Sequence, residues 1–380
     1  MKKLLFICAC TIASSLSAVV PGDRPGSASA RLEWLDCSPM PFGRIDPEVH
    51  KNIPPLRALV FMYTRAADSD RTISMLESLR RQNYEKVLIS AITPDSPDDA
   101  QEFRKRHKDV RVRMAVDLER RLTPEYMHGS IMLFPMAFLM DADGVIIWRG
   151  EAVDLPEAVE LQLAGKLDLA LQKKTAPMVY QMQQHMRSGN MFKLYSSAQE
   201  ILKIDPANAA ALRMAVFAAE NLNDLKGAWQ LTMVVLQKRP DLPRIYFTAL
   251  DLTMRHSECR PHLAALIAKF NRNPFTISVR CAFIDSLLNN FPFETAAVLG
   301  AKDILAATPM PLNAAAEQQG MILTVRSKLH YLLGSITSAE IDIAEAVNCF
   351  RAAGAKSSLI QAEKQLQYYR SLQQFLKQVK

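Results

Sequence analysis

The segment from Leu59 to Leu79 constrains the fold of this chain more than any other. It begins with five apolar residues, Leu59–Tyr63, which predict a buried strand. A small, polar loop, Thr64–Asp70, follows, and apolar residues then recur at helical spacing, with Asp70 as the predicted N-cap. A strand that leads through a short loop into a helix is typical of α/β domains, and the backbone amides at such a helix start favour negative charge.

The alternation of predicted strands and helices extends over residues 31–174. The further strands that we predict are Val87–Ile92, Val112–Val116, Met136–Met140 and Val145–Trp148. One further helix starts at Pro97, and another spans Leu155–Leu163. Asp141–Gly144 has the composition of a hairpin turn. This order predicts a mixed central sheet that is flanked by helices.

The order of these elements resembles the thioredoxin fold, and more closely the exported thiol–disulfide oxidoreductases of the redoxin type. In that family, a cis proline in the loop before a strand faces the active loop, and Pro135 stands at the matching position. The resemblance covers roughly Arg31–Leu169 and implies an α/β thioredoxin-like domain. The segments that carry it are Trp34–Met40, Leu59–Leu79, Phe134–Leu139, Asp143–Gly150 and Leu155–Leu169.

The active loop departs from the family pattern. The family has Trp-Cys-x-x-Cys, whereas this chain has Ala67 at the nucleophilic cysteine and Asp70 at the resolving cysteine. Attack on a disulfide requires a thiolate, and no cysteine follows Cys37 in this domain. We therefore interpret the loop that faces Pro135 as degenerate and redox-inactive, and we predict no cofactor and no metal site.

Two other interpretations of this region stay open. Cys37 is the remaining redox candidate, and it would make the protein a thiol–disulfide oxidoreductase or a peroxidase-like enzyme, alone or with a partner's cysteine. Asp68 and Asp70 suggest a metal loop, but two carboxylates without further ligands are a weak pattern. A helix N-cap in a polar loop explains the same residues without any function.

The second half of the chain, residues 175–380, has a different pattern. Pro206, Pro240, Pro274 and Pro309 are 34, 34 and 35 residues apart, and no strand pattern remains. A 34-residue period of paired helices that ends at a proline is similar to tetratricopeptide (TPR) repeats. The pattern predicts an all-α, TPR-like helical-repeat domain, with a generic helical array as the alternative.

The resemblance to TPR proteins implies a partner. The concave face of such arrays binds peptides or protein domains, so we expect a groove that is lined by the first helix of each pair, including Ala209–Val216 and Arg244–Leu250. The side chains that we expect to contact a partner are those of Arg213, Lys226, Gln230 and Tyr246. The sequence leaves the partner's identity and the oligomeric state open.

The N-terminus resembles a secretory signal. Lys2 and Lys3 precede an apolar stretch and then small residues, so we assign a signal peptide to 1–18 and a linker to 19–30. A lipid anchor at Cys10 is an alternative. No other run reaches the ~18 apolar residues of a membrane span. We expect an exported protein of the periplasm or cell envelope.

Charge and cysteine content give little support to other functions. The net charge of +7 is spread along the chain, and the basic segment 104–113 has no interleaved aromatic residues, so we predict no nucleic-acid binding. Cys259, Cys281 and Cys349 fit neither a CxxC motif nor a zinc site, and we interpret them as small buried side chains. A Cys259–Cys281 disulfide is an alternative. The sequence thus favours a protein-binding or scaffold protein, with an enzyme as the alternative.

Overall fold

The computed structural model describes residues 19–25, 32–35, 37, 39, 41–42, 44–45, 53–120, 122–127, 135–308 and 315–379. The chain divides into two compact units, residues 1–214 and 215–380, which we describe one at a time. The predicted signal peptide and residues 26–30 of the predicted linker lie outside the described residues.

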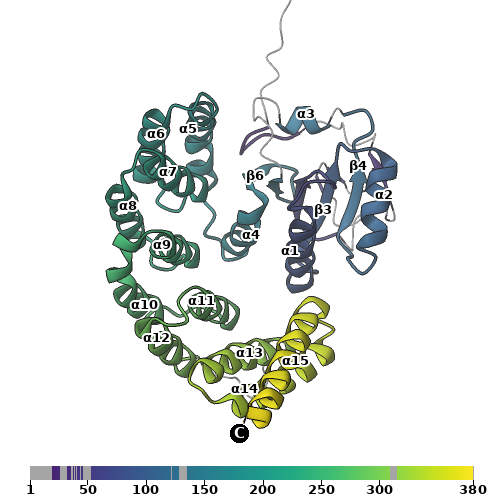
Figure 1. Ribbon diagram of the computed structural model, residues 1–380. Coiled ribbons are helices and arrows are strands. Elements are labelled where there is room, and N and C mark those ends of the chain that lie inside the picture. Colours follow the sequence, from purple (N-terminus) through teal and green to yellow (C-terminus); the bar gives the residue numbers. More distant parts are fainter. Residues whose placement is uncertain are drawn as a thin grey trace, which may run out of the picture. The chain divides into compact units, whose positions relative to one another are not determined.

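A mixed sheet forms the centre of the first unit (Figure 1). In the described part of the chain its six strands lie in the order β1-β4-β3-β2-β5-β6. β2, β3 and β4 are mutually parallel, whereas β1, β5 and β6 are antiparallel to their neighbours. The strands are β1 Glu33–Trp34, β2 Leu56–Phe61, β3 Val87–Thr93, β4 Arg113–Val116, β5 Met136–Met140 and β6 Ile146–Glu151.

Helices connect and cover these strands. α1 and α2 are the crossovers between the parallel strands, and a tight turn joins β5 to β6. This βαβαβ and then ββα order confirms the predicted thioredoxin-like architecture. The helices of the first unit are α1 Ser69–Gln82, α2 Pro97–Arg106, α3 Leu122–Met127, the 3-10 helix η2 Ala152–Asp154, α4 Leu155–Leu163, α5 Leu169–Arg187, α6 Met191–Ile204 and the start of α7 Ala209–Asn221.

The side chains of β2 alternate between two apolar cores. Ala58, Val60 and Met62 pack with α1 and α4 on one face of the sheet. Leu59 and Phe61 pack with α3 on the other face. Because both faces are covered, the strand is continuously apolar from Ala58 to Phe61 and not alternating, which is why a short apolar run predicted it correctly.

The local predictions for the first unit are confirmed with one exception. The strands and helices begin within three residues of the predicted positions, and α4 has the predicted bounds. The predicted N-cap is wrong, because α1 begins at Ser69 and Asp68 occupies the N-cap position. The short elements β1 and α3 were not predicted, since runs of two and six residues carry no periodicity.

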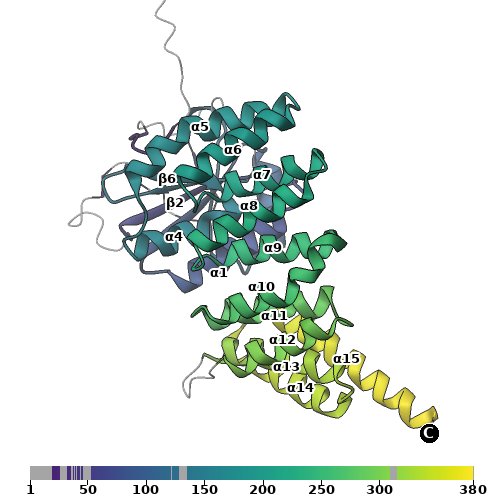
Figure 2. The same cartoon turned by 90° about the vertical axis from the view of Figure 1, so that its left-hand side faces the viewer.

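The second unit is entirely helical in its described residues, as predicted (Figures 1 and 2). Successive helices pack against each other, and α9, α11 and α13 also contact in series, as do α10 and α12, so that two layers form. The helices that follow α7 are α8 Leu225–Lys238, α9 Pro243–Arg255, the 3-10 helix η3 Ser257–His262, α10 Leu263–Asn271, α11 Ile277–Asn290, α12 Thr295–Ala306, α13 Ala316–Leu332, α14 Ile336–Ala353 and α15 Lys356–Val379.

The periodic prolines lie in turns between helices, as predicted. Pro206 lies between α6 and α7, Pro240 between α8 and α9, and Pro274 between α10 and α11. Pro309 lies outside the described residues. At the Pro274 turn, the buried guanidinium of Arg280 donates to the Asn273 carbonyl over 2.8 Å, so a cation stabilises the end of α10.

Aromatic side chains join α9, α10 and α11. The rings of Phe270 and Phe283 are stacked with their centroids 3.8 Å apart, and Tyr246 meets Phe270 edge-on. Tyr246 is fully buried, so the prediction that it is an exposed partner contact is wrong. The apolar packing of its ring outweighs the polarity of its hydroxyl, which finds a hydrogen bond from Asn273 at 2.8 Å.

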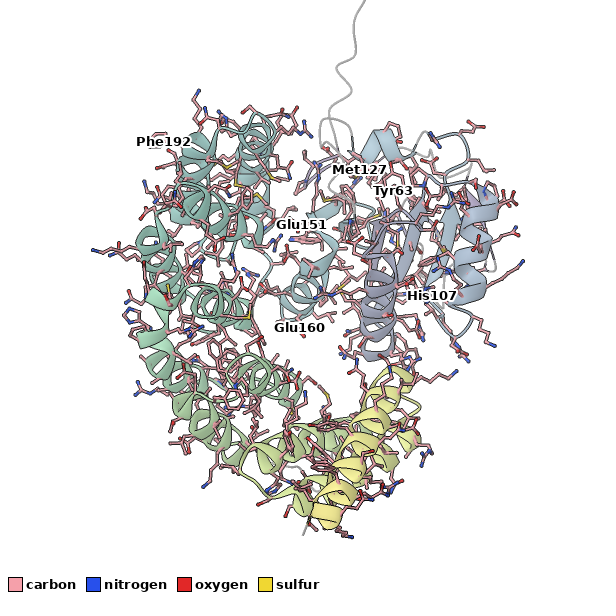
Figure 3. The ribbon with its side chains drawn as sticks, in the orientation of Figure 1. Tyr63, His107, Met127, Glu151, Glu160 and Phe192 are labelled. Carbon is pink, nitrogen blue, oxygen red and sulfur yellow. The ribbon has the colours of Figure 1, made fainter. Side chains whose placement is uncertain are left out.

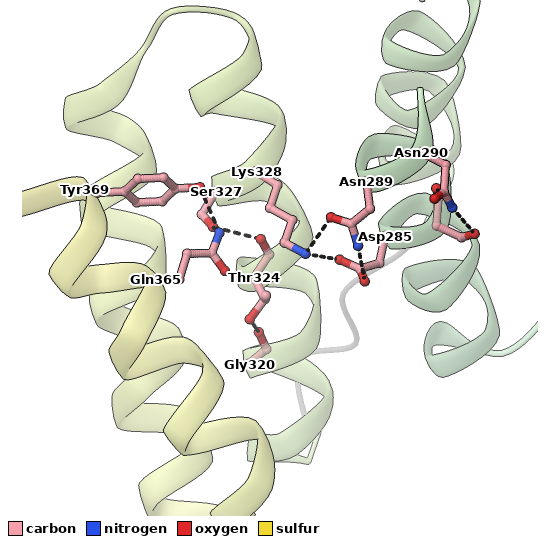
Figure 4. A network of polar contacts seen from close by, with 10 residues as sticks. Asp285, Asn289, Asn290, Gly320, Thr324, Ser327, Lys328, Gln365 and Tyr369 are labelled. Atoms are coloured by element: carbon pink, nitrogen blue, oxygen red, sulfur yellow. Dashed lines mark hydrogen bonds and ion pairs between the residues drawn. The ribbon is translucent and has the colours of Figure 1, made fainter. Parts of the chain in front are cut away.

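A polar network runs through the layer of α11, α13 and α15 (Figure 4). The Lys328 ammonium on α13 forms an ion pair with Asp285 and donates to Asn289, both on α11. On the opposite side of α13, the buried hydroxyl of Ser327 accepts a 3.3 Å hydrogen bond from Gln365 of α15, which also donates to Tyr369. Directional bonds therefore fix which helices are neighbours in this layer.

Candidate functional site

A pocket lies in the first unit at the start of α1. Its volume is about 680 Å³, and its walls come from α1, the start of β5, the β6–η2–α4 junction and the start of α7. Asp68 of the degenerate loop and Pro135 both line it. The complete lining is Asp68, Arg71, Thr72, Met75, Pro135, Glu151, Ala152, Val153, Pro156 and Met214.

The loop residues Ala67 and Asp70 carry no thiol. Ala67 is exposed, and Asp70 lies in the first turn of α1. The Asp70 carboxylate lies 2.8 Å from Nε2 of His107, which is labelled in Figure 3, and 3.7 Å from Nη1 of Arg106, at the end of α2. An acidic side chain near a helix start is favourable, and here it also joins α1 to α2. Asp70 thus serves a structural contact between α1 and the end of α2.

Further bonds hold the loop itself in place. The backbone N–H and the hydroxyl of Thr64 both donate to Asp95, over 2.6 and 2.7 Å. Arg65 forms an ion pair with Asp99 in the first turn of α2. The loop is therefore anchored to the β3–α2 segment at its beginning, and to the end of α2 through His107.

A half-buried ion cluster includes Glu151, which lines the pocket, and Arg213, which directly precedes the lining residue Met214. The guanidinium of Arg213, on α7, donates to both carboxylate oxygens of Asp154 over 2.8 and 2.9 Å, and it lies 2.9 Å from Glu151. Burial opposes the charge of Arg213, but the two carboxylates outweigh burial and raise its pKa. The expectation that Arg213 contacts a partner is wrong, because its guanidinium already binds Asp154 and Glu151 within the first unit.

Cys37 follows the edge strand of the sheet and lies away from this pocket. It follows β1, whose Leu35 N–H donates to the Met114 carbonyl of β4 over 3.1 Å. β4 and β3 both lie between β1 and β2. At ~4.8 Å per strand spacing, β1 and β2 are roughly 14 Å apart. β1 runs antiparallel to β4, so Cys37, which follows the end of β1, lies beside the start of β4. β4 and β2 run in the same direction, and the Thr64–Asp70 loop follows the end of β2. Cys37 and the loop therefore lie at opposite ends of the strands.

The described cysteines are all free, so the alternative of a Cys259–Cys281 disulfide has no support in the structure. Cys281 is buried, and burial raises the pKa of its thiol to about 12. Such a thiol has almost no thiolate at neutral pH and is a poor nucleophile.

The predicted cis Phe134–Pro135 bond involves Phe134, which lies outside the described residues. The described residues contain no cluster of three or more histidine, cysteine or acidic side chains that would suit a metal ion. Asp68 and Asp70, the residues of the metal-loop alternative, have different surroundings, since Asp68 lines the pocket and Asp70 contacts His107.

Several residues of this pocket were not predicted from the sequence. Met75, Glu151 and Met214 come from three different elements, and nothing in their local patterns connects them. The sequence could have predicted that Arg213 forms an ion pair, because it is the lone charge in the apolar run Ala209–Ala219. A single arginine on an otherwise apolar helix indicates a buried ion pair.

Comparisons with known proteins identify few similar chains. No protein-family model matches this sequence, and a search of curated proteins found no match. Among solved structures, the crystal structure of StoA from Bacillus subtilis matches with 18% sequence identity and a TM-score of 0.24, and the match covers 28% of this chain and 83% of that chain. A search of the described helices for a membrane-crossing segment found none.

Proposed function

We propose that this protein is an exported, redox-inactive thioredoxin-fold protein that binds a protein partner, with a TPR-like array as its main binding surface. The observation that carries the proposal is the chemistry at the loop. Ala67 and Asp70 replace both thiols, and Asp70 is bound to His107. A domain that keeps its fold and a pocket but has no nucleophile at the loop is suited to binding.

The helical half supports a binding function. Its helices pack in two layers with a 34-residue proline period, which is how repeat arrays build extended surfaces. A groove along three or four helix pairs supplies the ~800 Å² per partner of an ordinary protein interface. The predicted signal peptide supports a location of this binding in the periplasm or cell envelope.

The alternative is an oxidoreductase that uses Cys37. Its support is the thioredoxin-like fold, which does not by itself imply an activity. The position of Cys37 beyond the edge strand β1 weakens it, because the pocket and the helix start that would activate a thiol follow β2.

Reduction of insulin disulfides by dithiothreitol tests the redox part of the proposal. We expect the mature protein to give no turnover above the reagent alone. Turnover that disappears in Cys37→Ser would refute the proposal and establish the enzyme.

Site-directed photo-crosslinking in cells tests the binding part. A photoreactive residue replaces Asn289, which is exposed on α11, or, as the matched control, Leu299, which is 52% exposed on the adjacent α12 of the other layer. We expect a discrete adduct at the α11 position and none at the α12 position. Equal adducts at both positions, or none at either, would contradict binding along the layer of first helices.

A further inference from the structure

We propose that the last turns of α15 bind an anionic lipid surface, with an apolar stripe of side chains inserted among the lipid headgroups. The binding segment is Tyr368–Val379, which we call the α15 tail. This inference goes beyond the proposed function, because it concerns the last helix alone and needs no protein partner. Its basis is the projection of the tail, its amphipathic pattern and its charge.

The α15 tail extends beyond the helices that pack against α15. α14 has 18 residues and α15 has 24, so α15 is longer by about 9 Å at 1.5 Å per residue. Figure 2 shows the last turns of α15 running past the ends of α13 and α14. Ala362 and Tyr369 are buried, whereas none of the described residues after Tyr369 is buried. Most of the tail is therefore accessible to a binding surface.

The apolar side chains of the tail form one stripe. Tyr368, Leu372, Phe375 and Leu376 occupy positions i, i+4, i+7 and i+8, which share a face of a helix. Tyr368 is 53% exposed, Phe375 is 58% exposed and Leu376 is 39% exposed. Single exposed apolar residues are common on protein surfaces, but a stripe at helical spacing on a projecting helix indicates an interaction face.

The charge of the helix selects the kind of surface. Residues 364–380 contain four lysine or arginine residues and no aspartate or glutamate. Arg370 forms an ion pair with Glu340 of α14 over 3.1 Å. Lys364 and Lys377 are exposed, and neither has an ion-pair partner among the described residues. An anionic surface is therefore attracted, whereas a second copy of the tail would bring like charges together.

A lipid surface fits this combination best. An apolar stripe with phenylalanine and leucine beside a lysine-bearing polar face is typical of helices that lie in the headgroup region of a bilayer. A single projecting helix is convex, and a headgroup layer covers it without a matching groove. No described helix is long and apolar enough to cross a membrane, so the tail would lie on the surface. Each lysine near an anionic surface strengthens binding roughly fivefold.

Vesicle flotation of the predicted mature protein, residues 19–380, tests the inference. The probe is a vesicle of about 70% phosphatidylcholine and about 30% phosphatidylglycerol, and pure phosphatidylcholine vesicles are the control. We expect the protein to float with the anionic vesicles and to bind the neutral ones at least about tenfold more weakly. Sodium chloride at about 0.5 M should release most of the bound protein, because it screens the charges.

One pair of variants tests the apolar stripe. Phe375→Ser removes an exposed ring from the stripe, so the fold is retained, and we expect it to weaken binding to the anionic vesicles at least about fivefold. The matched control is Phe293→Ser, which removes a 95% exposed ring from the turn between α11 and α12 and should bind as the unaltered protein does.

A second pair of variants tests the charge. Lys364→Glu combined with Lys377→Glu should weaken binding at least about tenfold. The matched control reverses two exposed lysines elsewhere, Lys226→Glu on α8 with Lys302→Glu on α12, and changes the net charge of the protein equally. We expect this control to lose less than about threefold.

Four results would overturn the inference: no flotation, equal binding to the two kinds of vesicle, equal losses in the Phe375 and Phe293 variants, or equal losses in the two double variants. Sedimentation velocity without lipid adds a fifth, since a dimer that dissociates in Phe375→Ser would assign the stripe to a second copy of this chain. The crosslinking at Asn289 is an independent readout, so lipid binding can fail while partner binding by the array stands, and the reverse also holds.

Discussion

The carboxylate of Glu77 makes the first unit sensitive to acid. Glu77 is 6% exposed on α1, and its oxygens accept two bonds from Arg80, one from Arg81 and one from the backbone N–H of Arg111, over 2.8–3.0 Å. Burial alone would raise the pKa of Glu77, but the bonds from Arg80, Arg111 and Arg81 outweigh it and lower the pKa from 4.5 to about 2. The carboxylate therefore joins α1 to the segment before β4.

The shift in the pKa of Glu77 determines how much this carboxylate contributes to the free energy of unfolding. A change of roughly 2.5 pKa units at ~1.4 kcal/mol each corresponds to about 3 kcal/mol, and solvent screening at the half-exposed Arg81 reduces this to about 2 kcal/mol. Because the folded pKa lies below the unfolded pKa, the contribution is complete above about pH 5 and is lost as the pH falls towards 2. More than roughly half of it should be lost by pH 3.

We expect Glu77→Gln to lower the free energy of unfolding by about 2 kcal/mol at pH 7 and by less than about 1 kcal/mol at pH 3. The assay is urea unfolding followed by tryptophan fluorescence in a Trp229→Phe background, where the remaining tryptophans, Trp34 and Trp148, both report on the first unit. Glu102→Gln, at an exposed position of α2, is the matched control and should change stability by under about 0.5 kcal/mol. An equal loss at both pH values would refute the argument.

Three further predictions follow from other contacts. Arg213→Lys should lower the stability of the first unit by about 1–3 kcal/mol in thermal unfolding, because lysine cannot make the two-point bond to Asp154; an unchanged midpoint would mean that the pair is not formed. Phe283→Ala should destabilise the second unit by about 3–5 kcal/mol, measured by Trp229 fluorescence, since it removes a buried ring stacked on Phe270; a loss below 1 kcal/mol on the same measure would contradict this packing. Ellman's reagent at pH 8 should react quickly with the two half-buried cysteines and slowly with buried Cys281, and rapid labelling of Cys281 would show that its site opens.

The sequence predicted the main elements because local pattern and tertiary environment agree in them. β2 is buried on both faces, so its apolar run carries the whole signal, and Pro206, Pro240 and Pro274 lie where a helix must end. The N-cap prediction failed because two aspartates, two residues apart, compete for that position. Asp70 finds a tertiary partner in His107, which local reasoning does not see.

The pocket was not predictable for a related reason. The contact between Arg213 and Asp154 joins residues 59 positions apart, and the pocket draws on four separate elements. The sequence itself contains no cysteine in the loop. It gave no indication that the space beside the loop is retained and lined by methionines.

The polar network of α11, α13 and α15 limits how this chain can change its length. Inserting or deleting a helix pair within that layer would separate Lys328 from Asp285, or Ser327 from Gln365, and break the side-chain bonds between these helices. Apolar contacts between repeats are easily re-formed with a new neighbour, but these directional bonds are not. We expect duplications and losses of repeats over evolutionary time to be confined to the part of the array that precedes α11, while the C-terminal helices are inherited as a block.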